Sequence, residues 1–159
     1  MHSKASKIKM LITDVDGVMT DSGMYFSSTG EEMKRFNVKD GMAVGLCREN
    51  GIEYGIISAG HSLPLVSARA NVLKVEHVYV GKTPKIEIFN QWLKELNLQA
   101  DEIAYIGDDV KDIEVMQACG LSACPADAVQ QVISIADVVL SKNGGDGCVR
   151  EFVEDHLIA

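Results

Sequence analysis

The sequence predicts an α/β protein: a doubly wound, Rossmann-like parallel sheet with helices on both faces and one projecting β-hairpin. Short apolar segments alternate along the chain with segments of helical period, which is typical of this class. The first apolar segment, residues 8–12, is nearly continuous rather than alternating, as in a strand buried on both faces of a parallel sheet. Polar and acidic residues follow several such segments, and ligands bind at the carboxyl edge of open α/β sheets.

The expected elements follow this alternation from one end of the chain to the other. The expected strands are residues 8–12, 53–57, 77–80, 103–106, 121–124 and 138–140. The expected helices are residues 40–50, one that Ser62 caps and whose apolar face runs to Leu73, one that starts at Thr83-Pro84, a short one ending at Gly120, one from about Asp127 and a last one after Gly147.

Local signals support the helix ends and one core position. Gly51 is placed to end the first helix in a left-handed conformation. A threonine followed by proline, as at Thr83-Pro84, is a strong helix start. Trp92 belongs to the apolar stripe of the helix that follows, so we expect it in the core.

A hairpin of about residues 24–36 is the one expected insertion. Apolar residues on both sides of Ser27-Ser28-Thr29-Gly30-Glu31 indicate two short strands joined by a turn that projects from the sheet edge. Residues 1–6 look like a disordered start.

Composition restricts the class of protein. The 159 residues suit one domain spanning residues 1–159. The net charge is −8 and the basic residues are scattered, which argues against a nucleic-acid partner. No apolar stretch is long enough to span a membrane. The four cysteines have no CxxC spacing and no signal sequence precedes them, so we expect reduced thiols in a cytoplasmic protein.

Asp14 and Asp16 follow the first expected strand and are the centre of the predicted chemistry. Such a pair can hold a hard cation, or it can divide the roles of nucleophile and general acid/base, and both can hold together. Carboxylates about 4 Å apart repel by roughly 4 kcal/mol at an effective dielectric of 20, so the cluster calls for Mg²⁺ or a lysine. The alternative interpretation is an ordinary turn, since Asp and Gly are common turn residues.

Polar residues after other strands converge on the same edge. If the strands are parallel, Ser58 and Asp108 lie near the two aspartates, and Lys85 begins the helix after the third strand. A lysine in a first helical turn opposes the helix dipole unless an anion such as phosphate is present. The alternative for Lys85 is a solvated surface lysine.

The acidic cluster after the fourth expected strand leaves more than one assignment open. Asp108 is the favoured metal ligand, and Asp109 or Asp112 is expected to support the metal by orienting its water shell. Helix capping is the competing explanation for Asp109.

These residues resemble the four motifs of the haloacid dehalogenase superfamily, in order, over almost the whole chain. The motifs are Asp14-Val15-Asp16-Gly17-Val18, Ser58, Lys85 and Gly107-Asp108-Asp109-Val110-Lys111-Asp112. Further segments resemble the capless, tetrameric 3-deoxy-D-manno-octulosonate 8-phosphate phosphatase family: Thr29-Gly30-Glu31, Phe36-Asn37-Val38-Lys39-Asp40-Gly41, Ala104-Tyr105-Ile106, Gly144-Gly145-Asp146-Gly147 and Arg150-Glu151.

The resemblance implies a Mg²⁺-dependent phosphomonoesterase acting on a small keto-sugar phosphate through an aspartyl-phosphate intermediate, with a place in lipopolysaccharide biosynthesis. It implies that Asp14 is the nucleophile and Asp16 the general acid/base, and that Ser58 and Lys85 bind the phosphoryl group. Magnesium is then held by Asp14, the Asp16 carbonyl and Asp108.

One segment departs from the family pattern. Where the octulosonate phosphatases typically have Thr-Gly-Arg, this chain has Ser58-Ala59-Gly60-His61, and we expect these four residues to bind substrate or phosphate. Keeping Ser58 in register places Gly60 at the arginine position, and a shift by one places His61 there. Related nine-carbon keto-sugar phosphatases carry glutamate in this neighbourhood, so a nine-carbon substrate stays the alternative. His61 can equally be an exposed loop histidine.

The spacing of the motifs leaves no room for a lid domain, so another subunit is expected to cover the site. Relatives form homotetramers in which the hairpin and residues of a neighbour complete the site. By that resemblance Arg69 contributes across the interface, and its alternative is a surface helix residue. A receiver-like phosphoacceptor is less favoured, because receivers use a middle-strand aspartate and lack the second acid.

Overall fold

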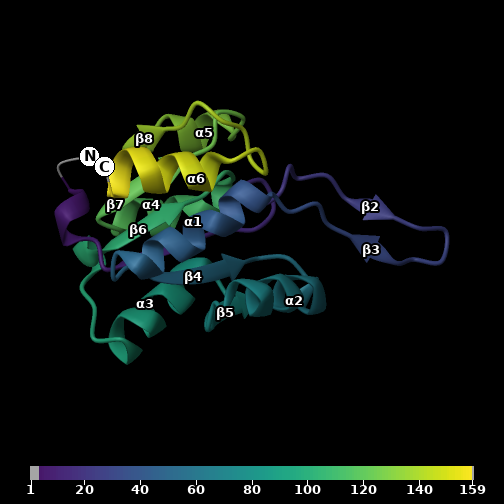
Figure 1. Cartoon of the computed structure of the whole chain (residues 1–159), viewed down its shortest axis with the longest axis horizontal. Helices are drawn as coiled ribbons and strands as arrows, with labels where there is room; N and C mark the ends of the chain where they lie inside the picture. Colours follow the sequence, from purple (N-terminus) through teal and green to yellow (C-terminus); the bar gives the residue numbers. More distant parts are fainter. Residues whose placement is uncertain (1–3, 159) are drawn as a thin grey trace.

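The computed structural model describes residues 4–158 and contains a parallel sheet between two layers of helices (Figure 1). The sheet strands are β1 (Met10–Thr13), β4 (Glu53–Ser58), β5 (His77–Val80), β6 (Ile103–Ile106), β7 (Leu121–Cys124) and β8 (Val138–Val139). The helices are α1 (Val38–Glu49), α2 (Leu63–Leu73), α3 (Lys85–Glu95), α4 (Ile113–Ala118), α5 (Gln130–Ile133) and α6 (Cys148–Phe152). Shorter helical turns are η1 (Ala5–Lys7), η2 (Ala100–Glu102), η3 (Val110–Asp112) and η4 (Val153–Leu157).

The strand order is β5-β4-β1-β6-β7-β8, and every neighbouring pair is parallel. Chain order therefore runs outward from β1 to β5, returns to β6 and continues to β8. In this doubly wound order the connections reverse direction between β1 and β6, which is where such sheets bind ligands. The predicted fold class and the parallel sheet are confirmed.

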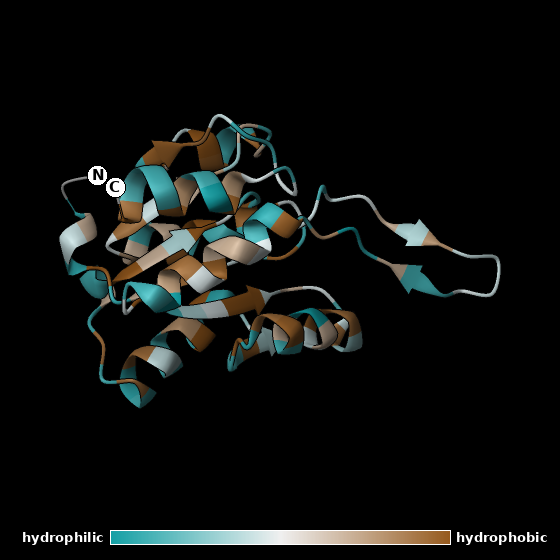
Figure 2. Cartoon of the chain, viewed as in Figure 1, coloured by the Kyte–Doolittle hydropathy of each residue, from teal (hydrophilic) through white to brown (hydrophobic). Residues whose placement is uncertain are grey.

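Alternate side chains of each strand enter two cores, one on each face of the sheet. Leu11 and Ile56 pack with α1, α2 and α6 on one face. Ile12 and Ile57 pack with α3, α4 and α5 on the other. All four side chains are fully buried, and full burial of one such side chain stabilises the fold by about 1.5–3 kcal/mol. In Figure 2 the edge strand β8 is hydrophobic, and the helix labelled α6 in Figure 1 shows hydrophilic residues on the side that faces the viewer.

A hairpin projects from this body, as predicted. Its strands β2 (Tyr25–Phe26) and β3 (Glu32–Met33) pair antiparallel, and Figure 1 shows that they extend well beyond the sheet and helices. Phe26 and Met33 are 58% and 60% exposed. The apolar side chains of the hairpin strands are thus largely exposed in the described part of the chain.

Several element boundaries differ from the expectations. Helix α1 begins two residues early because the Asn37 side chain accepts a hydrogen bond from the Lys39 N–H and caps it. Ser62 precedes α2 but does not cap it with its side chain, because its hydroxyl donates to Glu32 instead. At α3 the cap position belongs to Pro84 rather than Thr83. Helix α5 begins at Gln130, later than expected from Asp127.

The start of the chain is more ordered than its composition suggests. Residues 1–3 of the expected disordered start lie outside the described residues. Ala5, however, lies in η1 and is only 5% exposed, and Lys4 forms an ion pair with Asp137. These contacts attach residues 4–7 to the core, so the prediction of disorder is wrong there.

Two further findings concern the class of protein. All four cysteines, Cys47, Cys119, Cys124 and Cys148, are free thiols. Among residues 4–158, no helix is both long enough and apolar enough to cross a membrane.

Candidate active site

The site lies where the loop after β1 meets the loop after β6, at the reversal of strand order. Asp14 directly follows β1 and its carboxylate accepts a hydrogen bond of 2.6 Å from the Val15 N–H. Gly17 turns this loop with φ = +90°, and a Cβ at Gly17 would lie only 1.9 Å from Asp108 Oδ2. Glycine is therefore what allows the β1 and β6 loops to approach each other.

Lys85 is buried between two carboxylates. Its ammonium lies 2.7 Å from Asp14 Oδ2 and 2.6 Å from Asp112 Oδ1, and its side chain is 2% exposed. Burial acts to lower the pKa of Lys85, but the facing charges of Asp14 and Asp112 outweigh it and raise the pKa above its ordinary value. The alternative of a solvated surface lysine is wrong.

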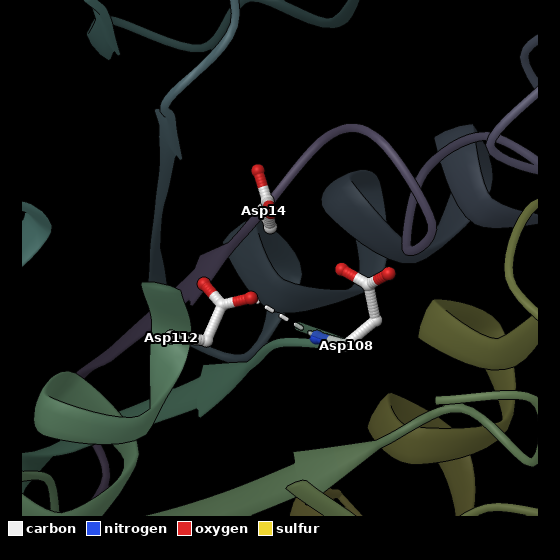
Figure 3. A group of neighbouring side chains, drawn as sticks. All are labelled: Asp14, Asp108 and Asp112. Atoms are coloured by element: carbon white, nitrogen blue, oxygen red, sulfur yellow. Dashed lines mark hydrogen bonds between the residues drawn. The ribbon is translucent and has the colours of Figure 1, made fainter. Parts of the chain in front are cut away.

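Asp112 is the buried anchor of this arrangement. Besides Lys85, it accepts hydrogen bonds from the Tyr105 hydroxyl at 2.6 Å and from the Asp108 and Asp109 N–H groups at 3.1 and 3.2 Å. Figure 3 shows the bond to the Asp108 backbone and the side chains of Asp14, Asp108 and Asp112 as neighbours. Because its oxygens already have four donors, Asp112 acts by holding Lys85 and the β6 loop in place.

Asp109 has a different environment from Asp112. It is exposed, and its carboxylate accepts from the Val110 N–H at 2.7 Å, where η3 begins. This geometry agrees with the helix-capping interpretation of Asp109. Asp109 also lines the cavity described below.

The geometry fits a divalent cation. Carboxylate oxygens of Asp14, Asp108 and Asp112 lie within 4.8 Å of one another, and Asp108 Oδ1 is buried without a hydrogen-bond partner among residues 4–158. Burial is the largest cause that raises the pKa of Asp14 to about 7 and that of Asp108 to about 8. Repulsion from the neighbouring carboxylates adds to both increases, while Lys85 opposes them. A hard cation with oxygen ligands would relieve this cost.

A cavity of about 330 Å³ opens at this cluster. It is lined by Asp14, Asp16, Ser22, Ser58, Ala59, Gly60, Lys85, Asp108, Asp109 and Lys111. The Ser58 hydroxyl accepts from the Gly60 N–H at 3.1 Å, so the turn after β4 presents a hydroxyl and backbone N–H groups beside the acids. The structure thus brings together Asp14, Asp16, Ser58, Lys85 and Asp108, as the sequence analysis expected.

Two predicted binding residues, His61 and Arg69, are not among the residues that line this cavity. His61 has a 73% exposed side chain and lies 3.7 Å from Glu32, outside the residues that line this cavity. Arg69 stacks over the Phe36 ring at 5.6 Å and donates to the Asn37 carbonyl at 3.2 Å, which places it where α2 meets the start of α1. Their binding roles stay predictions.

Lys34 is a residue at the site that the sequence analysis missed. Its ammonium lies 2.6 Å from Asp16 Oδ1 although it follows the hairpin strand β3. The sequence predicts that the hairpin covers the site of another subunit, and no local pattern indicates which of its charged residues turns back toward β1. Only the tertiary path of the hairpin base makes this contact.

Comparisons with known proteins agree with this geometry. Residues 57–152 match the family model described as haloacid dehalogenase-like hydrolase. The 3-deoxy-D-manno-octulosonate 8-phosphate phosphatase of Escherichia coli K12 is 40% identical over 157 residues, which cover 99% of this chain and 83% of that protein.

Solved structures give the same result. The crystal structure of 3-deoxy-D-manno-octulosonate 8-phosphate phosphatase from Yersinia pestis has a TM-score of 0.90 and 38% identity, covering 97% of this chain and 86% of that one. A second structure is that of the enzyme of the same name from Moraxella catarrhalis, in complex with a magnesium ion, a phosphate ion and a KDO molecule. It has a TM-score of 0.90 and 32% identity, and the match covers 95% of this chain and 86% of that one. The chain belongs to the haloacid dehalogenase-like hydrolases, within the family of the 3-deoxy-D-manno-octulosonate 8-phosphate phosphatases.

Proposed function

We propose that this chain is a Mg²⁺-dependent phosphomonoesterase that hydrolyses 3-deoxy-D-manno-octulosonate 8-phosphate. The observation that carries the proposal is the buried Asp14–Lys85 pair beside Asp108, which combines a nucleophile, a cation and a metal-binding carboxylate. The names of the relatives support the substrate, and the magnesium ion in the Moraxella complex supports the metal.

The proposed reaction proceeds in two steps. An Asp14 carboxylate oxygen attacks phosphorus, the bond from phosphorus to the sugar oxygen breaks, and Asp16 gives its proton to that oxygen. Asp16 then takes a proton from a water molecule that attacks the aspartyl phosphate, which restores Asp14 and releases inorganic phosphate. The Ser58 hydroxyl and the Ala59 N–H bind the phosphoryl oxygens, and the Lys85 ammonium balances their charge.

Asp14, the Asp16 carbonyl and Asp108 are the proposed magnesium ligands. When bound, the metal would supply positive charge against the phosphoryl oxygens and keep Asp14 ionised. Asp112 supports this set indirectly, because it holds both Lys85 and the Asp108 backbone.

The Asp14→Asn variant tests the nucleophile. It is expected to lower phosphate release from the octulosonate ester by on the order of 10⁴-fold or more, because the amide cannot form the acyl phosphate. The matched control is Asp101→Asn, which alters an exposed carboxylate that pairs with Lys7 outside this cavity and should retain most activity. Release by Asp14→Asn at a rate close to that of the unmodified protein would remove Asp14 from the proposed role.

A nine-carbon keto-sugar phosphate is the second candidate substrate. Ser58-Ala59-Gly60-His61 stands where relatives are expected to carry Thr-Gly-Arg, so the contact that would select the eight-carbon acid differs in this chain. Comparing kcat/KM for eight- and nine-carbon esters decides between the two, and a higher value for the nine-carbon ester would replace the first candidate.

We further propose a cytoplasmic homotetramer in which a neighbouring hairpin covers the cavity, with His61 and Arg69 as substrate-binding residues. The exposed apolar side chains of the hairpin support the assembly. Arg69 Nε, buried without a hydrogen-bond partner in the described part of the chain, supports a further polar contact for that guanidinium.

A further inference from the structure

Lys34 differs from the apolar side chains of the hairpin in being buried. Its side chain is 4% exposed, whereas Tyr25, Phe26 and Met33 on the hairpin strands are 45 to 60% exposed. The Lys34 ammonium lies 2.6 Å from Asp16 Oδ1 and 3.2 Å from Glu32 Oε1. Burying an ammonium costs several kcal/mol in solvation unless charged partners offset it, so these two carboxylates explain its position.

Glu32 attaches this contact to the rest of the site. Its second carboxylate oxygen accepts a hydrogen bond from the Ser62 hydroxyl and lies 3.7 Å from His61 Nε2. A continuous set of contacts therefore runs from the loop after β1, through the hairpin base, to the loop after β4. Its members are Asp16, Lys34, Glu32 and Ser62.

Asp16 depends on this set for its orientation. Its carboxylate is 40% exposed, and in the chain from residue 4 to residue 158 its one hydrogen-bonding partner is Lys34. Asp14, in contrast, is bonded to both Lys85 and the Val15 N–H. A side chain held by one partner loses that orientation when the partner is removed, because its other rotamers become accessible.

We propose that Lys34 is a positioning residue for Asp16. This inference rests on the proposed function, in which Asp16 protonates the leaving oxygen. Lys34 keeps its proton throughout and transfers nothing; it holds the carboxylate of Asp16 toward the cavity. General acid catalysis contributes about 10²–10⁴-fold and depends on hydrogen-bond reach to the leaving oxygen, so a displaced Asp16 loses much of that contribution.

The test compares two leaving groups in the Lys34→Met variant. The value of kcat/KM reports on the steps up to and including departure of the leaving group. The sugar leaves as an alkoxide, which needs a proton from the general acid, whereas 4-nitrophenolate leaves without one. Lys34→Met should lower kcat/KM for the octulosonate ester by about 10²-fold and change it less than about threefold for 4-nitrophenyl phosphate. Lys34→Arg should recover much of the loss, since it keeps a cation at that place.

Arg35→Gln is the matched control. Arg35 is the neighbouring residue, is 55% exposed and pairs with Asp21 at 3.4 Å, so both esters should react at unchanged rates. An equal loss for both esters in Lys34→Met would indicate a phosphate-binding or purely structural role and would overturn the proposal, as would no loss for either.

A second measurement does not depend on activity. Crystal structures of the unmodified protein and of Lys34→Met should show Asp16 in one orientation in the first and displaced or in several rotamers in the second. An Asp16 side chain that keeps its place without Lys34 would overturn the inference. The rates of the unmodified protein on the octulosonate ester separately test the proposed function, so the two failures are distinguishable.

Discussion

Gly17 shows how one residue serves two loops at once. Next to Asp16 it reads as an ordinary turn glycine, and its φ of +90° agrees with that interpretation. The tighter constraint comes from Asp108, whose carboxylate occupies the space that a Cβ would need. A side chain at position 17 would therefore displace the Asp108 carboxylate from its place beside the β1 loop.

The carboxylate cluster predicts a pH-dependent effect of magnesium on stability. In the metal-free protein the pKa of Asp14 is about 7 and that of Asp108 about 8, both above the ordinary value of 3.8. The folded state therefore binds more protons than the unfolded state between about pH 4 and pH 8, and stability from this site is lost as pH rises through that window. A bound cation would remove this penalty.

We therefore expect the rise in Tm on adding magnesium to be larger at about pH 8 than at about pH 5.5. Thermal unfolding with magnesium or with chelator at the two pH values measures it. The Asp108→Asn variant is the control, since it should lose most of the difference between the two pH values. A rise that is equal at both values, or greater in acid, would contradict a cation among these carboxylates.

Helix α3 shows what holds the site in place at the scale of elements. It begins at Lys85 and buries Ile88, Phe89 and Trp92 against the sheet. A Cβ at Gly55 in β4 would lie 2.7 Å from the Trp92 ring, so the glycine makes the space that the ring fills. The packing of Trp92 therefore fixes the helix whose first residue is Lys85, the lysine that pairs with Asp14.

Trp92→Ala is expected to destabilise the fold by about 3–5 kcal/mol, because the cavity left behind forfeits a large apolar burial. In a chain of this size that corresponds to a fall in Tm of roughly 6 to 20 °C. Val72→Ala on α2 is the control: Val72 is 72% exposed, and the change should stay within about 0.5 kcal/mol. A Trp92→Ala protein as stable as the control would show that α3 is held by other contacts.

The hairpin matters at the scale of the whole molecule. Met24, Tyr25, Phe26 and Met33 are 45 to 60% exposed on an element that extends away from the body (Figure 1). Exposed apolar groups gathered on one projecting element mark a surface that binds a partner. In the proposed tetramer that partner is the mouth of a neighbouring subunit's cavity.

The double variant Phe26→Ser, Met33→Ser is expected to weaken the tetramer and to raise KM together, since one surface serves both assembly and cover. Light scattering measures the mass, and steady-state rates give KM. Ser28→Ala, at the exposed turn of the same hairpin, should change neither. A tetramer that survives the double variant with an unchanged KM would exclude the hairpin from both roles.

The amino-acid sequence by itself determined the alternation of strands and helices, and from it the edge where Asp14, Asp16, Ser58, Lys85 and Asp108 meet. This was possible because the spacing of apolar residues is a local property that identifies buried strands. When such strands are parallel, the loops that follow them all leave from the same edge of the sheet.

The tertiary structure alone decided which charged groups touch. Lys85 could be solvated or buried, Asp109 or Asp112 could support the metal, and Lys34 had no assigned place, since each outcome depends on distances between residues far apart in the chain. A buried charge without a partner loses the free energy of its solvation by water, so buried charged groups are found in pairs. That loss arises only when the folded chain excludes water from the site.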